Sequence, residues 1–238
     1  SQLPRKLDVM NATEFALYRN DFAYFSTQSG YEDIGEGTPQ SKYPFKAPFS
    51  LGKGTDWIDE ITRTAPYQNY SLSISGRSKK SSYYASLGYN DSQGIIDNSG
   101  LQRITGRLNL AHQLFKWLKV GYRGSYTWRD NAQNLAEIGG TAYYRAAMYL
   151  SPHIDPQENY NPLWGNGQRI NTPRATIDQN TYSIERTSLN HTAYLEVALA
   201  KGLKLRSQNS YYSFQRHTYR YYPGSLPANN EGAGGQAY

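Results

Sequence analysis

Six stretches of this 238-residue chain alternate apolar and polar side chains with a period of two. In the first of them, Tyr70, Leu72 and Ile74 alternate with serines. Successive side chains of a β-strand point to opposite faces of its sheet, so this period predicts strands that are apolar on one face only. The six predicted strands cover residues 67–76, 82–91, 101–111, 117–129, 187–200 and 203–219. The chain is therefore expected to be all-β and antiparallel.

The connections between the predicted strands alternate strictly in length. Three are short (77–81, 112–116 and 201–202), whereas 92–100 is long and 130–186 is very long. Transmembrane β-barrels have short turns at one end and long loops at the extracellular end. The predicted strands also have roughly the 9–11 residues that cross a bilayer when tilted. Both patterns favour a segment of a transmembrane barrel with its long loops outside the cell.

The two faces of such a sheet meet different solvents. A charge on the lipid face costs about 2–4 kcal/mol near the midplane, so the apolar alternates are expected to face lipid and the polar ones a wet or plugged interior. The residues predicted to face the lumen are Ser73, Arg103, Arg107, Asn109, Lys119, Arg123, Asn190 and Glu196.

The last predicted strand is the least regular. Ser207 and Asn209 share the face of Leu203 and Leu205. A β-bulge would explain this change, and so would the end of the apolar zone, and the sequence does not choose between them.

Composition is compatible with a membrane barrel. No run of apolar residues approaches the ~20 that a membrane helix needs, and the mean hydropathy is −0.76. Tyrosine is unusually frequent, with 23 Tyr against 7 Phe, and suits half-wet surfaces. The aromatic residues placed near strand ends, as in an interfacial girdle, are Tyr70, Tyr89, Trp117, Tyr126 and Trp128.

Charge and cysteine content narrow the function classes. The net charge is +6, but basic residues fall singly or in turns, so a nucleic-acid surface is not expected. The absence of cysteine excludes disulfides and thiolate metal sites.

Six strands leave unpaired edges that lipid does not tolerate, and no targeting signal is visible. We therefore expect a piece of a longer protein.

Two helices are expected outside the strands. Asn11 and Glu14 have the spacing of a capping box, and Phe15, Tyr18, Phe22 and Phe25 follow at helical spacing. This pattern predicts a short amphipathic helix near 12–25 that packs on the body of the protein.

A second helix is expected within the long insert. Asn134 and Glu137 repeat the capping-box spacing, and an apolar stripe from Leu135 to Tyr149 ends before Ser151 and Pro152. The remainder, through residue 186, is expected to be turn-rich loop.

Four segments resemble SusC/RagA-type TonB-dependent transporters of Bacteroidota outer membranes. They are LDVMNATEFALY (7–18), GTDWIDEITRTAPYQNYSLSISG (54–76), SLGYNDSQGIIDNSGLQRITGRLNL (86–110) and HQLFKWLKVG (112–121). The resemblance covers roughly residues 1–130 through these motifs and 187–212 through pattern alone. Ile58, Thr62 and Tyr70 depart from the residues expected at their positions.

The resemblance implies an architecture and partners. Residues 1–238 would be about six strands of a large plugged barrel, with extracellular inserts near 5–66 and 130–186 and without the plug domain. A SusD-like surface lipoprotein would close over the barrel, and the TonB–ExbB–ExbD complex would act through the missing plug. The resemblance further implies a multi-pass outer-membrane protein that imports an oligosaccharide, or alternatively an oligopeptide.

No catalytic motif stands out, and the chain is not expected to be an enzyme. His112, His153, His191 and His217 lack metal-binding spacing. Asp56, Asp59 and Glu60 surround Trp57 and could hold Ca²⁺ in an extracellular loop. A solvated acidic turn anchored by the Trp is the favoured interpretation, so no cofactor is expected.

Sugars are held by aromatic platforms and planar polar side chains, which the long insert provides. The candidate substrate-binding residues are Tyr143, Tyr144, Tyr160, Asn161, Trp164 and Arg169. For each of them, loop packing or contact with a partner lipoprotein is the alternative. Two other functions stay open at this point: an outer-membrane barrel enzyme and a soluble carbohydrate-binding β-sandwich.

Overall fold

A single antiparallel sheet dominates the structure, a computed structural model that describes residues 6–28, 44–132, 141–156, 172–224 and 236–237. Consecutive strands are neighbours throughout, so the order in the sheet is the order in the chain. The six long strands are β1 (Tyr67–Arg77), β2 (Ser81–Gln93), β3 (Gly100–Phe115), β4 (Leu118–Ala132), β5 (Thr181–Ala200) and β6 (Leu203–Tyr222). A two-residue strand, β7 (Gln236–Ala237), pairs with the end of β6.

The six predicted strands and their antiparallel arrangement are confirmed, but several strands are longer than predicted. β3 continues to Phe115, which reduces the predicted turn to two residues. β5 begins at Thr181, six residues before the predicted start at 187. Glu185 and Arg186 break the apolar alternation there, yet both pair with β4 and β6. Backbone pairing therefore extends beyond the apolar zone from which the strand was recognised.

The irregularity in β6 is not a β-bulge of that strand. From Leu205 to Tyr221 the pairing with β5 proceeds without a register shift. The only shift between these strands lies at Ala198 and Ala200, at the turn end. Ser207 and Asn209 therefore remain on the face of Leu205, opposite Leu195 and Ala193.

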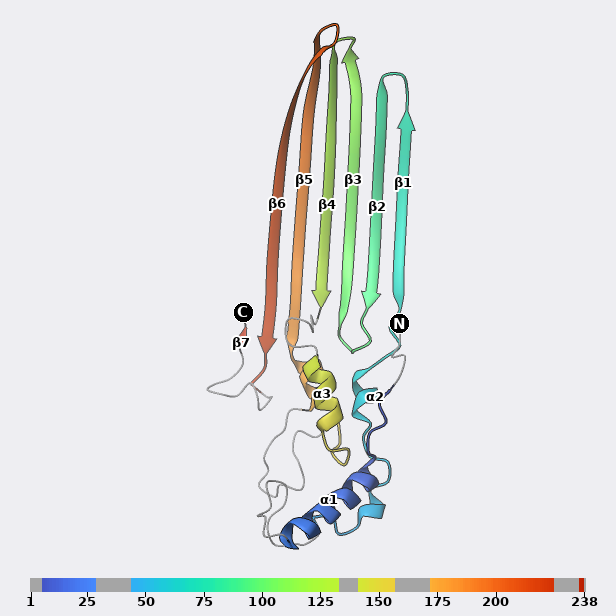
Figure 1. Cartoon of the computed structure of the whole chain (residues 1–238), viewed down its shortest axis with the longest axis vertical. Helices are drawn as coiled ribbons and strands as arrows, with labels where there is room; N and C mark the ends of the chain where they lie inside the picture. The colour runs from blue at the N-terminus through green and yellow to red at the C-terminus, as the bar shows by residue number, and fades with distance from the viewer. Residues whose placement is uncertain (1–5, 29–43, 133–140, 157–171, 225–235, 238) are drawn as a thin grey trace.

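Short and long connections lie at opposite ends of the sheet (Figure 1). The short turns join β1 to β2, β3 to β4 and β5 to β6. In the last of them Gly202 has a φ of +83°, a conformation that glycine adopts without steric cost. At the other end, called the loop end below, lie α1 (Ala12–Gln28), η1 (Pro48–Ser50), α2 (Trp57–Ile61), α3 (Thr141–Tyr149) and α4 (Pro173–Gln179). In the described parts of the chain, no helix has the length and apolar character to cross a membrane.

α1 begins with the predicted capping box. The Glu14 amide donates to Asn11 Oδ1 at 2.9 Å, and the Asn11 amide donates to Glu14 Oε2 at 2.9 Å. The helix packs on the body of the protein, as predicted, but its aromatic residues do so unequally. Phe15 contacts Phe45 and His153, whereas Tyr18 and Phe22 are exposed and Phe25 is 67% exposed.

Small residues make most of the packed side of α1. The buried side chains are Ala12, Ala16, Asn20 and Ala23. The Asn20 side chain donates to the Phe45 carbonyl at 2.8 Å and accepts from its amide at 2.9 Å. Short side chains let the helix backbone come close enough for this amide pairing.

The buried core lies at the loop end. It comprises Trp57, Ile58, Ile61, Ile96, Ala147, Ile154 and Ile177. These residues come from α2, the β2–β3 loop, α3, the segment after α3, and α4. We call this set the loop core; it joins segments that are more than a hundred residues apart in the sequence.

The expectation of loop throughout residues 150–186 is wrong, because α4 lies within it. The Thr172 hydroxyl accepts from the Ala175 amide at 3.1 Å, and Pro173 occupies the first turn. α3 ends before Ser151 and Pro152, as expected. Asn134, Leu135, Glu137 and Ile138, which were expected to start its helix, lie outside the described residues.

The soluble β-sandwich is contradicted by the sheet. It requires the apolar alternates to be enclosed between two sheets. The described strands form one sheet, and Leu72 and Leu87 are 73% and 61% exposed.

Candidate functional site

Cross-strand pairing determines which side chains share a face of the sheet. Ser73 lies opposite Ser86, Ser86 opposite Arg107, and Arg107 opposite Ser125. We call the face defined by this row the polar face. The residues predicted to face the lumen all lie on it: Ser73, Arg103, Arg107, Asn109, Lys119, Arg123, Asn190 and Glu196.

The opposite face, called the apolar face below, carries the other parity. Ile74 lies opposite Ala85, and Ala85 lies opposite Leu108. Tyr70 and Tyr89 pair across β1 and β2 with stacked rings whose centroids are 6.4 Å apart. The apolar side chains of neighbouring strands are therefore in register.

Charge is divided between the two faces. Every Lys and Arg side chain of β1–β6 lies on the polar face. These residues are Arg77, Arg103, Arg107, Lys119, Arg123, Arg129, Arg186, Lys204, Arg206, Arg216 and Arg220. Of the carboxylates in these strands, only Glu196 shares this face, and Asp91, Asp130 and Glu185 lie on the apolar face near the loop end.

Some of the arginines on the polar face were not predicted from the sequence to lie there. Arg129 has the parity of Arg123 and could have been assigned from it. Arg186 preceded the predicted fifth strand, and Arg216 lay beyond the irregular part of the sixth. Only the pairing of β5 and β6 shows that they share a face with the others.

Tyr194 forms an aromatic platform on the polar face, near the short-turn end of the sheet. The guanidinium carbons of Arg206 and Arg123 lie 4.3 and 5.8 Å from its ring centroid, within cation–π range. A Cβ at Gly121, on the neighbouring strand, would come within 2.1 Å of the ring. The glycine therefore lets the ring lie against the sheet. Rings and guanidinium planes of this kind suit a ligand with flat faces and hydroxyl groups.

Two of the predicted substrate-binding residues, Tyr143 and Tyr144, lie on α3. Both are half-buried against the loop core. Burial raises the pKa of the Tyr143 hydroxyl, and the nearby Tyr222 acts in the same direction, against a hydrogen bond from Asn180 that lowers it. Tyr143 is therefore a neutral hydroxyl at physiological pH. The other four, Tyr160, Asn161, Trp164 and Arg169, lie outside the described residues.

The acidic residues around Trp57 cap α2 and bind a lysine. Asp56 Oδ1 accepts from the amides of Ile58 and Asp59 at 3.2 Å. Its other oxygen binds Lys6, whose Nζ is also 2.6 Å from Asp59. Among the described residues, no group of three Asp, Glu or His side chains is placed to hold a metal ion.

The pKa values of this group follow from these contacts. Burial opposes ionisation of Asp56, but the Lys6 hydrogen bond and the backbone amides outweigh it and lower the pKa of the carboxyl. Burial also opposes the charge on Lys6, but its bonds to Asp56 and Asp59 raise its pKa. Both groups are therefore charged at neutral pH.

Arg174 joins α4 to α2 and the β2–β3 loop. Its Nη1 donates to the Glu60 carbonyl at 2.9 Å and to Asp97 at 2.6 Å. It also pairs with Asp178, one turn along α4, and this bond together with that to Asp97 raises the pKa of the guanidinium despite burial. These contacts fix α4 against α2 and the β2–β3 loop.

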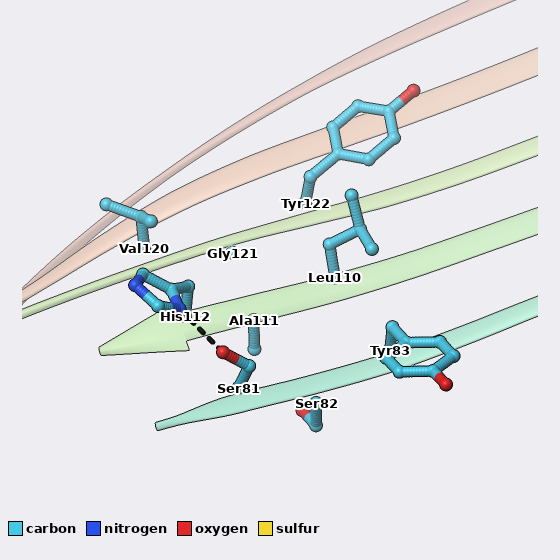
Figure 2. Close-up of a pocket in the computed structure, with 9 residues that line it drawn as sticks. All are labelled: Ser81, Ser82, Tyr83, Leu110, Ala111, His112, Val120, Gly121 and Tyr122. Atoms are coloured by element: carbon cyan, nitrogen blue, oxygen red, sulfur yellow. Dashed lines mark hydrogen bonds between the residues drawn. The ribbon is translucent and has the colours of Figure 1, made fainter. Parts of the chain in front are cut away.

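A groove of about 580 Å³ lies at the short-turn end of the sheet (Figure 2). Ser81 Oγ and His112 Nδ1 are 2.7 Å apart at its edge, and Tyr83, Leu110 and Tyr122 line it.

Among the strand residues that the structure describes, no carboxylate is placed to orient His112 as in a catalytic triad. The carboxylates of β1–β6 lie near the loop end or, for Glu196, on the polar face, and His112 is on the apolar face. Two of the other three described histidines are engaged elsewhere: His191 bonds the Tyr122 hydroxyl, and His153 stacks on Phe15.

Comparison with known proteins shows that several TonB-dependent receptors are similar in sequence to this chain. TonB-dependent receptor P26 of Formosa agariphila is 29% identical over 171 residues, which cover 69% of this chain and 16% of that protein. TonB-dependent receptor SusC of Bacteroides thetaiotaomicron is 32% identical over 158 residues, covering 63% and 16%. Receptor P3 of Formosa agariphila is 27% identical over 241 residues, covering 97% and 22%.

The chain spans 16% to 22% of the length of these three relatives. No protein-family model matches the chain.

Solved structures share the fold. The RagAB peptide importer in its closed-closed state superimposes with a TM-score of 0.65 and 20% identity, over 95% of this chain and 29% of that chain. Its open-open state gives a TM-score of 0.67 at 18% identity, over 95% and 28%. The matched region of these transporters therefore contains the same arrangement of strands.

Proposed function

Because the chain is a barrel segment of a SusC/RagA-type TonB-dependent transporter, we propose that the intact protein imports a nutrient across the bacterial outer membrane. The observation that carries this proposal is the division of the sheet into a charged and an apolar face, with every Lys and Arg of six strands on one side. A sheet in which one face meets water and the other meets lipid needs this division.

The sheet would be oriented with its polar face toward the lumen. Its apolar face carries the exposed leucines and tyrosines and would meet lipid. The short turns would then lie in the periplasm, and the loop core with α1–α4 outside the cell. Residues 1–238 would form part of a larger plugged barrel, in which further strands pair with the edges of this sheet.

The cargo would be an oligosaccharide, with an oligopeptide as the alternative. Support for a sugar comes from the Tyr194 platform with its two arginines, because flat aromatic and guanidinium surfaces suit sugar rings. The solved relative is described as a peptide importer, which keeps the alternative open. In the loops, the residues that we propose to touch the cargo are Tyr143, Tyr144, Tyr160, Asn161, Trp164 and Arg169.

Two partners follow from this function. A SusD-like surface lipoprotein would cover the loop end, where the exposed Tyr18, Phe22 and Phe25 of α1 offer an aromatic contact surface. The TonB–ExbB–ExbD complex would supply energy through a plug domain in the intact transporter. No cofactor is part of this proposal.

Uptake of labelled oligosaccharides and oligopeptides by cells that carry the intact transporter would test the function. Deletion of the transporter or of TonB should abolish uptake of the cargo, because entry through a plugged barrel needs energy. Uptake that continues without TonB would overturn the proposal. Hydrolysis of the cargo by a transporter that lacks its plug, in cells without TonB, would favour the barrel enzyme.

A further inference from the structure

The groove at the short-turn end of the sheet opens on the apolar face. Leu110 on β3 forms its floor, between Tyr83 on β2 and Tyr122 on β4 (Figure 2). The Tyr83 ring leans over Gly76 of β1, where a Cβ would lie 2.5 Å from the ring. The Tyr122 hydroxyl instead bonds His191 of β5. The two rings therefore diverge, and the groove of about 580 Å³ between them has the size of a ligand pocket.

The groove is polar at the end nearest the turns. Ser81 Oγ and His112 Nδ1 are 2.7 Å apart there. When the hydroxyl donates to Nδ1, the ring proton lies on Nε2, which can donate to an anionic oxygen. Lys79 and Lys80 directly precede Ser81, and the Lys80 carbonyl accepts from the Gln113 amide at 2.7 Å. This backbone bond places the lysine-containing turn beside the polar end of the groove.

The whole short-turn end of the sheet is basic. Its turns carry the exposed lysines Lys79, Lys80, Lys116 and Lys201 and no Asp or Glu. Among the described carboxylates of β1–β6, only Glu196 lies toward this end, and it is on the polar face, 3.5 Å from Lys204. The turns beside the groove therefore attract anions.

The polar end of the groove also coincides with one edge of the apolar band. On β2 the apolar face extends from Ser81 to Asp91, and on β3 from His112 to Gln102. The ten residues between these ends, at about 3.4 Å each in a strand tilted by about 40°, rise about 26 Å. The apolar band of a membrane barrel is about 25 Å tall. The Ser81–His112 pair would therefore lie at a headgroup layer, with the rest of the groove in the hydrocarbon.

We propose that this groove binds one anionic phospholipid of the leaflet that faces the periplasm. An acyl chain occupies the groove over Leu110, and the phosphate group binds Lys79, Lys80 and His112. Charged hydrogen bonds to phosphate are strong, and an apolar groove that ends in basic residues fits an amphiphile better than a soluble anion. The inference rests on the proposed orientation of the sheet, with its short turns in the periplasm, and not on the cargo.

Native mass spectrometry of the full-length, purified transporter tests the charged end of the site. The probes are phosphatidylglycerol, which is anionic, and phosphatidylcholine with the same acyl chains, which has no net charge. A separate sample contains inorganic phosphate as competitor. The test variant combines Lys79→Gln with Lys80→Gln. A matched control combines Lys46→Gln with Lys53→Gln, which removes the same charge at the loop end.

The unaltered transporter should retain phosphatidylglycerol in preference to phosphatidylcholine. The variant without Lys79 and Lys80 should lose at least about fivefold of this preference, because each basic side chain near an anionic lipid contributes about this factor. The loop-end control should behave like the unaltered protein. The combination of Lys79→Arg with Lys80→Arg keeps both charges and should keep the preference.

The apolar part of the site is tested by Leu110→Trp. Leu110 is 43% exposed, so the larger side chain should fill the groove without disturbing a core. Retention of phosphatidylglycerol should fall, because the acyl chain loses its place. Leu87→Trp is the matched control, since Leu87 is 61% exposed on the same face but does not line the groove. It should leave retention unchanged.

Five results would overturn the inference. They are equal retention of the two lipids by the unaltered protein, an unchanged preference in the Lys79 and Lys80 variant, an equal loss in the loop-end control, unchanged retention in Leu110→Trp, and displacement of the lipid by inorganic phosphate. Any of these in a transporter that still imports its cargo would overturn only this inference. Absence of any TonB-dependent uptake would overturn the proposed function itself.

Discussion

At the scale of single residues, Gly54 shows how closely the segments of the loop end approach one another. Its φ is +65°, and a Cβ placed there would lie 2.3 Å from the Pro152 carbonyl oxygen and 2.5 Å from the Ala12 side chain. The adjacent Thr55 amide donates to the same Pro152 carbonyl at 2.7 Å. Gly52 has a similar φ of +62°, but nothing lies within 4 Å of its Cβ position.

Gly52 and Gly54 have similar φ values but different surroundings, so substitutions at the two positions distinguish backbone strain from steric crowding. Gly52→Ala should cost about 1 kcal/mol, the strain of a left-handed alanine. Gly54→Ala should cost at least about 2 kcal/mol, because contact with the Pro152 backbone adds to the strain. Hydrogen exchange of the Thr55 amide in the full-length transporter measures the local destabilisation in both variants. Equal protection in the two variants would show that α1 and the segment at Pro152 do not pack around Gly54.

Sequence patterns predicted some single-residue features and missed others. The Asn11 and Glu14 capping box follows from three-residue spacing, and it is present. The helical period of the aromatic residues of α1 predicted a helix packed on the body of the protein, and it is packed, but mainly through its alanines and Phe15. Spacing shows which side chains share a side of a helix. It does not show which side can approach a neighbour closely enough to pair Asn20 with the Phe45 backbone.

At the scale of elements, the start of α2 is sensitive to acid. Asp56 caps the helix and binds Lys6, and its pKa is lowered from 3.8 because the Lys6 bond outweighs the effect of burial. A carboxyl whose folded pKa is lowered contributes stability that is complete above its unfolded pKa. This contribution is lost as the pH falls through the lower folded value.

Cleavage by pepsin between about pH 2 and 5 should therefore reveal opening of the α2 segment as the pH falls below about 4. The Asp56→Asn variant keeps a capping oxygen but has no carboxyl group to titrate. At low pH, where Asp56 is protonated, the unaltered protein should be cleaved as fast as this variant. The effect is modest, because the Asp56 side chain is 44% exposed. A constant ratio of the two rates across this range would contradict the coupling to Lys6.

Elements with strong periodicity were predicted well, and the others were not. The six strands alternate over enough residues to be recognised, although β5 continues six residues beyond its apolar zone. α4 was missed because its short sequence lies among turn residues. It is held in place by tertiary contacts, namely Ile177 in the loop core and Arg174 on Asp97 and the Glu60 carbonyl.

At the scale of the whole molecule, the orientation of the sheet can be tested on neighbouring residues of β1. Leu72 lies on the apolar face and Ser73 on the polar face. In the full-length transporter, Leu72→Arg should cost about 2–4 kcal/mol in the bilayer. Ser73→Arg, one residue along, should assemble normally, because its side chain would point into the lumen.

The amount of heat-modifiable barrel in the outer membrane measures both variants. A clear loss for Leu72→Arg alone supports the orientation. If the two variants assembled equally well, or if Ser73→Arg were the defective one, the assignment of the apolar face to lipid would be wrong.

The sequence by itself determined the strands, their up-and-down order and the parity that separates the apolar face from the polar face. These features depend on local spacing and on the length of connections, which a chain carries in its order of residues. Parity also placed Arg103, Arg107 and Arg123 on one side before any pairing was known.

Only the tertiary structure decided which distant segments of the chain are in contact. The loop core gathers Trp57, Ile96 and Ile177 from segments far apart in the chain. The alignment of Arg103, Arg129, Arg186 and Arg216 depends on the register of three strand pairs. Short turns constrain the register of β3 with β4 and of β5 with β6. The register of β4 with β5, which are far apart in the sequence, is decided only when the sheet is formed.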